Sequence, residues 1–203
     1  MAGVASHDNP LVTVLVGPES CGKTTLAGYL GSTLAAPVVP EVARTYFAEV
    51  AASSKLDMPR NSVAYDAADL LAISKRQVAA EEQILAQTDG PVVVADTDLT
   101  VIDVWWQDKV GKPTAEFVAL RQRERQRSRK YRRVYLLCYP DLAWQPDPLR
   151  ENPTDRLRLF GSYLDLLQGE GRQFRVIWGQ GAHREKLALE YCRRLLGEQH
   201  PIT

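Results

Sequence analysis

The sequence predicts an α/β fold, in which a three-layer α/β/α sandwich is built around a mostly parallel five-stranded sheet. Apolar, β-branched runs recur along the chain, at residues 11–16, 36–41, 91–96, 133–139 and 174–179. Continuous apolar runs are typical of strands buried on both faces, as in parallel sheets. Segments with helical spacing separate these runs, at residues 23–34, 41–52, 62–88, 114–130, 153–168 and 182–196. This alternation predicts βαβ crossovers, with helices on both faces of the sheet.

Composition and punctuation predict a single domain over residues 1–203. Proline and glycine fall between the expected elements, without a low-complexity linker or a repeat. Lysine and arginine total 25, as do aspartate and glutamate, so overall charge predicts neither a nucleic-acid nor a membrane partner. The sequence shows no signal peptide and no spanning apolar run, so we expect a cytoplasmic protein. Cys21, Cys138 and Cys192 are widely spaced, which predicts reduced thiols rather than disulfides or a zinc site.

A glycine-rich stretch follows the first apolar run directly. Gly17, Gly22, Lys23 and Thr24 match the P-loop pattern GxxxxGK[ST], between an expected strand and an expected helix. The glycines let backbone N–H groups face phosphate oxygens, Lys23 is expected to reach the β- and γ-phosphates of ATP, and Thr24 is expected to hold Mg²⁺. An accidental glycine turn would not explain why the pattern lies between an expected strand and an expected helix. The predicted nucleotide-binding residues are Gly17, Glu19, Ser20, Cys21, Gly22, Lys23, Thr24 and Thr25.

Two aspartates follow the third apolar run. Asp96 ends the run and Asp98 comes two residues later. A carboxylate at the end of a buried strand can hold Mg²⁺, so Asp96 is predicted to join Thr24 on the metal, and Asp98 is predicted to face the phosphoryl acceptor. Each could instead be a turn former or a helix cap.

The remaining sequence favours a kinase among P-loop proteins. It has no NKxD-like or LSGGQ-like motif and no arginine-finger domain after the core, which disfavours switches, motors and transporter subunits. A proline-rich stretch follows the fourth expected strand and predicts a lid around 140–156 that excludes water from the transfer. Arg150 and Arg156 in this lid are expected to neutralise charge on the transferred phosphate. Solvated arginines are the alternative.

Several further motifs follow the phosphate loop in a fixed order. They are VVPEVARTYF at 38–47, YDAADLLAISKRQ at 65–77, VVVADTDLTVIDVW at 92–105, YLLCYPDLAWQPDPLR at 135–150 and DRLRLFGSYLDLL at 155–167. This order resembles the nicotinamide riboside kinase domain of the bacterial NadR family, over about residues 11–185. The resemblance implies a stand-alone, Mg²⁺-dependent P-loop kinase that transfers the γ-phosphoryl group of ATP to the 5′-hydroxyl of nicotinamide riboside, for NAD salvage. The family more often has glycine where Pro148 stands.

Glu41 and Arg44 lead the predicted acceptor side. They stand three residues apart after the second expected strand, at the edge where α/β sheets bind ligands, although a surface ion pair is the alternative. Glu41 or Asp98 is expected to orient the acceptor hydroxyl. The predicted catalytic residues are Lys23, Asp98, Glu41, Arg150 and Arg156.

Other acceptor contacts are expected from one helix and from aromatic residues. Asp66 and Gln77 fall on one helical stripe, which fits either a pocket face or an ordinary amphipathic helix. A cationic pyridinium ring would favour aromatic faces, for which Tyr46, Tyr65, Trp105 and Trp106 are candidates, with one of the two tryptophans in the core. The predicted substrate-binding residues are Glu41, Arg44, Tyr46, Asp66, Gln77, Asp98 and Trp105.

The arginine-rich segment 121–133 is expected to form a solvated helix face. Nucleic-acid binding is disfavoured because no aromatic residues alternate with the arginines. Two alternatives to the leading function stay open: a kinase for another nucleoside or small metabolite, and a nucleotide-hydrolysing switch protein that binds a partner through this segment.

Overall fold

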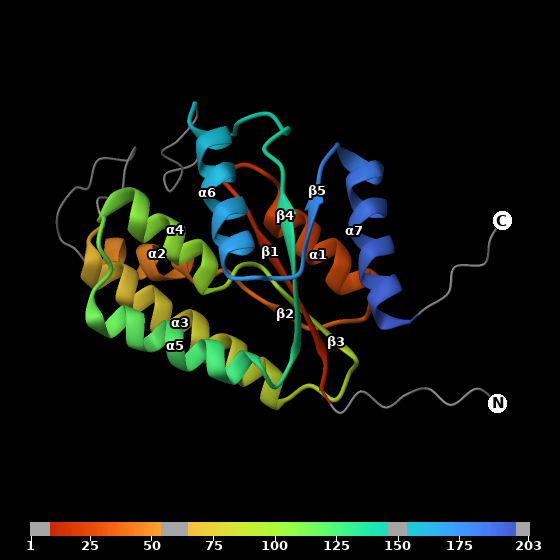
Figure 1. Cartoon of the computed structure of the whole chain (residues 1–203), viewed down its shortest axis with the longest axis horizontal. Coiled ribbons are helices and arrows are strands. Elements are labelled where there is room, and N and C mark those ends of the chain that lie inside the picture. Colours follow the sequence, from red (N-terminus) through yellow and green to blue (C-terminus); the bar gives the residue numbers. More distant parts are fainter. Residues whose placement is uncertain (1–8, 54–64, 146–153, 198–203) are drawn as a thin grey trace.

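The computed structural model describes residues 9–53, 65–145 and 154–197, and it confirms the predicted α/β fold. Its sheet has five strands in the order β2-β3-β1-β4-β5, and every pair is parallel (Figure 1). The strands are β1 (Leu11–Val16), β2 (Val38–Val39), β3 (Val92–Ala95), β4 (Arg132–Cys138) and β5 (Phe174–Ile177). The helices are α1 (Lys23–Thr33), α2 (Ala43–Ser53), α3 (Ala67–Ala86), α4 (Leu99–Lys109), α5 (Ala115–Ser128), α6 (Arg156–Gly169) and α7 (Gly181–Leu196).

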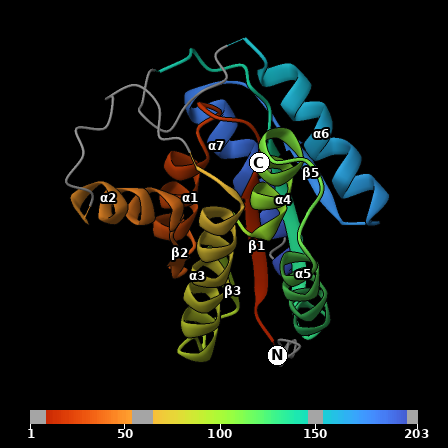
Figure 2. The ribbon, with the colours of Figure 1, turned by 90° about the vertical axis from the view of Figure 1, so that its left-hand side faces the viewer.

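The central strand β1 shows how the sheet separates two cores. Every residue of β1 is buried, and successive side chains point to opposite faces of the sheet. Leu11 and Leu15 pack in a cluster with residues of α1 and α7. Val12 and Val14 pack in a second cluster, with residues of α3, α4 and α6. Helices therefore cover both faces, as the continuous apolar runs predict (Figures 1 and 2).

A third apolar cluster joins the outer helices to one another. It is formed by α2, α3, α4 and α5, and it includes Phe47, Ile73 and Trp106. The Trp106 side chain is fully buried and stacks on Phe117, with ring centroids 4.4 Å apart. Trp106 is thus the core member of the tryptophan pair, and it packs α4 against α5.

The structure differs from the sequence predictions at several elements. Helix α4 was not predicted, because its first turns are apolar and β-branched and follow β3 after only three residues. Strand β2 has two residues rather than six. Helix α3 begins at Ala67, five residues later than expected, because Asp66 caps it by accepting hydrogen bonds from the N–H groups of Ala68 and Asp69. Among the described residues, no helix is long and apolar enough to cross a bilayer.

Because all five strands are parallel, their carboxyl ends meet at one edge of the sheet. The connections after β1, β2, β3, β4 and β5 all leave the sheet at this edge. In open α/β sheets this is the edge where ligands bind. The predicted nucleotide and metal residues, and Glu41 and Arg44 among the predicted acceptor residues, lie in or next to these connections.

Candidate active site at the phosphate loop

The connection between β1 and α1 has the backbone of a phosphate-binding loop. Gly17, Ser20 and Gly22 have positive φ angles, of 138°, 53° and 77°, and Gly22 is the N-terminal cap of α1. Turns of this kind point successive N–H groups inward, and the N-terminus of α1 adds a positive dipole to the same space. The local structure therefore suits an anion such as a phosphate group.

Gly17→Ala tests whether this loop needs its glycine. An alanine Cβ at residue 17 would lie 2.6 Å from the backbone oxygen of Cys138, in a conformation that L-residues rarely adopt. We expect the variant to lose ATP-analogue binding in fluorescence titration, and to lose about 1–3 kcal/mol of unfolding free energy. Gly28→Ala is the matched control, since residue 28 has open space in α1 and should bind as the original chain does. Unchanged binding by Gly17→Ala would contradict the loop's role.

Lys23 lies in this loop with its ammonium group turned back onto the loop itself. Its Nζ donates hydrogen bonds to the backbone oxygens of Gly17 and Pro18, at 2.9 and 2.8 Å. Burial works to lower the pKa of Lys23, but the charges of Cys21 and Glu41 raise it above its ordinary value. Lys23 is thus a positive charge held at the mouth of the loop, where it can move onto phosphate oxygens.

Thr24 and Asp96 fit the predicted magnesium site. Asp96 follows β3, its side chain is almost fully buried, and its Oδ1 has no hydrogen-bond partner. Burial raises the pKa of Asp96, whereas a hydrogen bond from Thr24 and the charges of Lys23 and Arg44 oppose the rise. A buried, unpartnered carboxylate oxygen beside a threonine hydroxyl matches the oxygen ligands that Mg²⁺ takes next to bound phosphates. Among the described residues there is no cluster of three metal-binding side chains, so the remaining ligands would come from phosphates and water.

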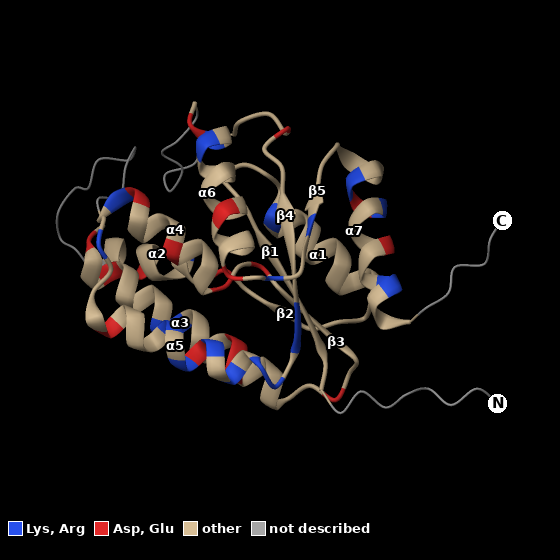
Figure 3. Cartoon of the chain, in the orientation of Figure 1, with Lys and Arg blue, Asp and Glu red and all other residues tan. Residues whose placement is uncertain are grey.

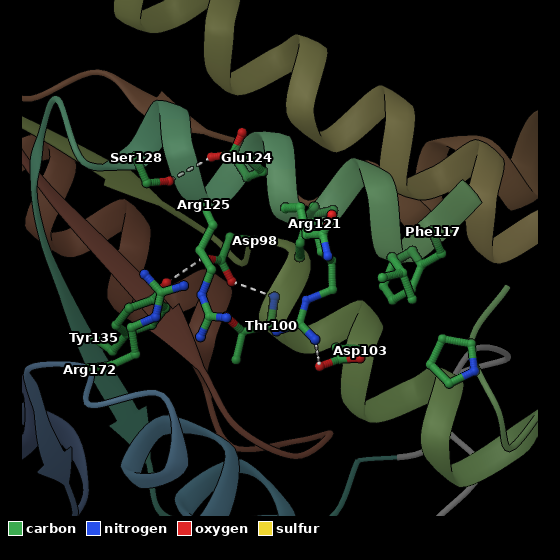
Figure 4. A pocket seen from close by; sticks show the side chains of 14 residues that line it. Asp98, Thr100, Asp103, Phe117, Arg121, Glu124, Arg125, Ser128, Tyr135 and Arg172 are labelled. Atoms are coloured by element: carbon green, nitrogen blue, oxygen red, sulfur yellow. Dashed lines mark hydrogen bonds and ion pairs between the residues drawn. The ribbon is translucent and has the colours of Figure 1, made fainter. Parts of the chain in front are cut away.

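The structure does not place Asp98 where the sequence analysis predicted it. Thr97 has a φ angle of 88°, and this turn separates the directions of Asp96 and Asp98. Asp98 caps α4 through the N–H of Thr100 and accepts hydrogen bonds from Arg133 and Tyr135, both at 3.0 Å. It lines a cavity of roughly 180 Å³ between α4, α5 and β4, rather than the phosphate-loop pocket (Figure 4). The helix-cap alternative describes Asp98 better than an acceptor-facing role does.

Glu41, Arg44 and Trp105 do meet the phosphate loop. They line a pocket of roughly 100 Å³ with seven consecutive residues of the loop and α1, namely Glu19, Ser20, Cys21, Gly22, Lys23, Thr24 and Thr25. Glu41 lies just before α2, and Arg44 lies in its first turn. The charge of Glu41 raises the pKa of Lys23, and the charge of Arg44 lowers the pKa of Asp96. The two predicted acceptor residues are therefore near the predicted phosphate and metal residues.

Gln77 holds this acceptor side in place rather than lining the pocket. Its buried side chain accepts a hydrogen bond from the N–H of Val42 at 3.1 Å and donates one to the oxygen of Pro40 at 3.1 Å. These two bonds clamp the backbone on either side of Glu41. Gln77 is not among the residues that line the phosphate-loop pocket, and substrate contact by Gln77 stays a prediction.

Tyr46 and Asp66 lie at the junction of α2 and α3, outside the residues that line the phosphate-loop pocket. The Tyr46 hydroxyl donates a 2.6 Å hydrogen bond to Asp69, and this bond, more than burial, raises the pKa of Tyr46 to about 12. The Asp66 side chain is exposed and is used by the α3 cap. The centre of the Tyr65 ring, by contrast, lies 6.3 Å from the centre of the Trp105 ring. Trp105 lines the pocket, so Tyr65 lies next to a pocket residue.

The described part of the predicted lid contacts the phosphate loop. Ser20 and Gln145 form two 3.3 Å hydrogen bonds, and a Cβ on Gly22 would meet the side chain of Leu142. Arg156 donates to the oxygen of Leu142 at 2.8 Å, with its guanidinium 5.8 Å from the centre of the Trp144 ring. Arg156 is therefore placed to support the segment over the loop. Arg150 lies outside the described residues, and lid closure stays a prediction.

Arg184 is a central residue of this region that the sequence analysis missed. Its buried guanidinium donates to the backbone oxygens of Cys21, Tyr139 and Gly179, at 2.7, 3.0 and 2.9 Å, and pairs with Asp141 at 2.7 Å. It joins the phosphate loop to the connections after β4 and β5. The one signal in the sequence is an arginine shortly after the glycine-rich end of the last strand, which does not by itself predict three backbone partners.

Comparisons with known proteins agree with this geometry. A family model described as an AAA domain matches residues 12–186. No curated protein matches the sequence. Two solved structures share the fold: a NadR protein in complex with NR, at a TM-score of 0.69 and 22% identity, and a NadR protein in complex with NAD and AMP-PNP, at 0.66 and 21%. The matches cover 97% and 96% of this chain, but 54% and 52% of the NadR chains, so this chain spans about half their length.

Proposed function

Because the chain belongs to the AAA domain family and folds like NadR, we propose that it is a P-loop kinase whose phosphoryl acceptor is nicotinamide riboside. The reaction would be Mg²⁺-dependent transfer of the ATP γ-phosphoryl group to the 5′-hydroxyl, giving nicotinamide mononucleotide. The observation that carries the kinase proposal is the shared pocket, in which Glu41, Arg44 and Trp105 face the phosphate loop. A pocket lined on both sides can hold a donor phosphate and an acceptor together.

On the donor side, the residues act by positioning and by charge. The loop N–H groups and Lys23 would hold the β- and γ-phosphates, and Lys23 would exchange its bonds to Gly17 and Pro18 for phosphate oxygens. Thr24 and Asp96 would hold Mg²⁺, which when bound neutralises charge that develops on the phosphates. Buried and unpartnered, the Asp96 oxygen gains from such a partner.

On the acceptor side, Glu41 is the carboxylate that we assign to the acceptor hydroxyl. It lines the pocket with Lys23, while Asp98 lies in a different cavity. The transition state of phosphoryl transfer is loose, so orienting the hydroxyl matters more than removing its proton early. Arg44 would bind the ribose, and the Trp105 face would lie against the cationic ring. The NadR structure in complex with NR supports this choice of acceptor.

A panel assay tests the proposal and its alternatives. Purified protein would be incubated with ATP, Mg²⁺ and single nucleosides, and ADP and the phosphorylated product would be measured. Turnover highest on nicotinamide riboside is the expected result. Turnover confined to another nucleoside would replace the acceptor but keep the kinase. ADP formation that no small acceptor stimulates would overturn the kinase proposal in favour of a nucleotide-hydrolysing switch.

Glu41→Gln tests the orienting carboxylate. We expect kcat/KM for the acceptor to fall roughly 10²-fold, because a carboxylate in this role contributes at the lower end of acid–base effects. Binding of an ATP analogue should change little, since the phosphate loop remains intact. Glu49→Gln is the matched control, because Glu49 lies on α2 but is exposed and paired with Arg76. Equal kcat/KM values for the two variants would remove Glu41 from the site.

A further inference from the structure

Two buried thiols lie behind the phosphate loop, one on each side of Gly17. Cys21 belongs to the loop itself, and Cys138 ends β4, the strand that pairs with β1. Both side chains are buried and share a hydrogen bond. A Cβ on Gly17 would lie 3.1 Å from the sulfur of Cys21 and 2.6 Å from the oxygen of Cys138. Only a glycine leaves room between the Cys21 sulfur and the Cys138 backbone.

The surroundings of Cys21 make it the reactive member of the pair. Burial works to raise its pKa, but the hydrogen bond from Cys138 and the charges of Lys23 and Arg184 lower it to about 6. The Lys23 Nζ lies 3.9 Å from the sulfur; when protonated, the thiol donates to the oxygen of Pro18. These charges and the hydrogen bond favour the thiolate form of Cys21, and the thiolate is the form that reacts with peroxides.

Cys21 is among the residues that line the nucleotide pocket, although its side chain is buried, so this pocket is the route by which a small reagent would approach it. The third cysteine has different surroundings. Cys192 lies in α7, its weak contact is with the Thr13 hydroxyl at 3.8 Å, and burial raises its pKa to about 11. Cys192 is therefore protonated at neutral pH and is the built-in control for the reactivity of the other two.

We propose that hydrogen peroxide converts Cys21 and Cys138 into a reversible disulfide that switches off phosphate binding by the loop. The Cys21 thiolate attacks one peroxide oxygen, the O–O bond breaks, and Cys21 becomes a sulfenic acid while the released hydroxide takes a proton to become water. The Cys138 sulfur then attacks the Cys21 sulfur, the S–O bond breaks, and a second water leaves with the Cys138 proton. Two thiols have then given two electrons to one peroxide.

The disulfide would act on the loop through its backbone. The new bond ties Cys21 to the end of β4, whereas in the reduced protein the Cys21 carbonyl is held by Arg184 at 2.7 Å. It also removes the thiolate charge next to Lys23, which helps to hold the ammonium group at the loop. The N–H groups of residues 20–22 would turn with the Cys21 backbone, so a phosphate would lose its aligned donors. A nucleotide bound beforehand would cover the sulfur.

Mass spectrometry and nucleotide binding together test the switch in the full chain. Protein treated with hydrogen peroxide at pH 7.5 should lose the mass of two hydrogen atoms, and peptide mapping should link Cys21 to Cys138. Affinity for a fluorescent ATP analogue should fall at least about tenfold, which is 1.4 kcal/mol. Dithiothreitol should restore both readouts, and ATP added before the peroxide should slow the mass change. Added oxygen at Cys21 without a disulfide, or no change in mass, would overturn the proposal.

Three serine variants complete the test. Cys192→Ser should form the disulfide as the original chain does. Cys21→Ser should not form it, and Cys138→Ser should stop at a sulfenic acid that dimedone traps on Cys21. Loss of nucleotide binding after peroxide in Cys138→Ser equal to that of the original chain would show that the disulfide is not the cause, and would overturn the switch. None of these readouts uses the acceptor, so they stay decisive even if nicotinamide riboside is not the substrate.

Discussion

Replacing Lys23 with alanine is expected to lower kcat for phosphoryl transfer by roughly 10²- to 10³-fold, the usual effect of removing a preorganised donor from a developing negative charge. Among the residues that the structure describes, Lys23 is the one lysine that lines the phosphate-loop pocket, and its ammonium group is already held at the loop by two backbone oxygens. Alanine leaves those oxygens without their partner and the γ-phosphate without its cation. The steady-state rate of ADP and product formation measures the loss.

The control for this result is Lys75→Ala. Lys75 is exposed on α3, where it pairs with Glu116, so its removal should leave turnover within about twofold, in line with the small energies of surface ion pairs. Circular dichroism would establish that both variants are folded. Turnover by folded Lys23→Ala at the level of Lys75→Ala would contradict the assignment of the whole donor site, because the remaining donor residues depend on the same loop geometry.

The sheet could be predicted from the sequence because its signal is local. Each strand is a short apolar run, and a strand buried on both faces needs apolar residues in succession, as β1 has. Helix α4 was missed for the same reason. Val101 packs with residues of the sheet, and Ile102 packs in the cluster of the outer helices. Helix α4 therefore has apolar residues on two sides, and the polar face that marks most helices is nearly absent.

The candidate site also has a part that could be predicted from the sequence and a part that could not. The phosphate loop is continuous in the sequence, so its residue types and spacing predict its structure. The role of Asp98 depends on the turn at Thr97 and on Arg133 in another strand, which no local pattern contains. The backbone contacts of Gln77 and Arg184 likewise join segments 37 and 163 residues apart, and they exist only once the chain has folded.

The arginine-rich segment 121–133 was expected to be a solvated helix face, but several of its arginines form ion pairs within the fold. Helix α5 carries four arginines in its second half, with glutamates at 116 and 124 (Figure 3). Arg121 pairs with Asp103 and Glu170, and Arg127 pairs with Glu81 and Glu124. The sequence shows the arginines of this segment together, but, apart from Glu124 in α5 itself, these partners come from α3, α4 and the end of α6. Ion pairing within the fold thus uses the charges of Arg121 and Arg127.

Arg133 is the most buried arginine of this network and gives the largest expected effect on stability. Its side chain is 4% exposed and pairs with Glu81, which is equally buried, and with Asp98 at 3.0 Å. Arg133→Met keeps most of the volume but leaves the buried Asp98 without its cation, and leaves Glu81 with Arg127 alone. Removing one partner of a buried pair costs about 3–5 kcal/mol, so we expect the urea unfolding free energy to fall by that amount.

Two further variants separate this cause from a simple packing defect. Arg123→Met removes an exposed arginine from the same segment and should change the unfolding free energy by less than about 0.5 kcal/mol. Adding Glu81→Gln to Arg133→Met should recover part of the loss, because one uncompensated carboxylate is then neutral and the two changes couple. If the double variant is less stable than Arg133→Met by the full cost of Glu81→Gln alone, the two sites are independent. The buried ion pair would then not be what joins α3 to β4.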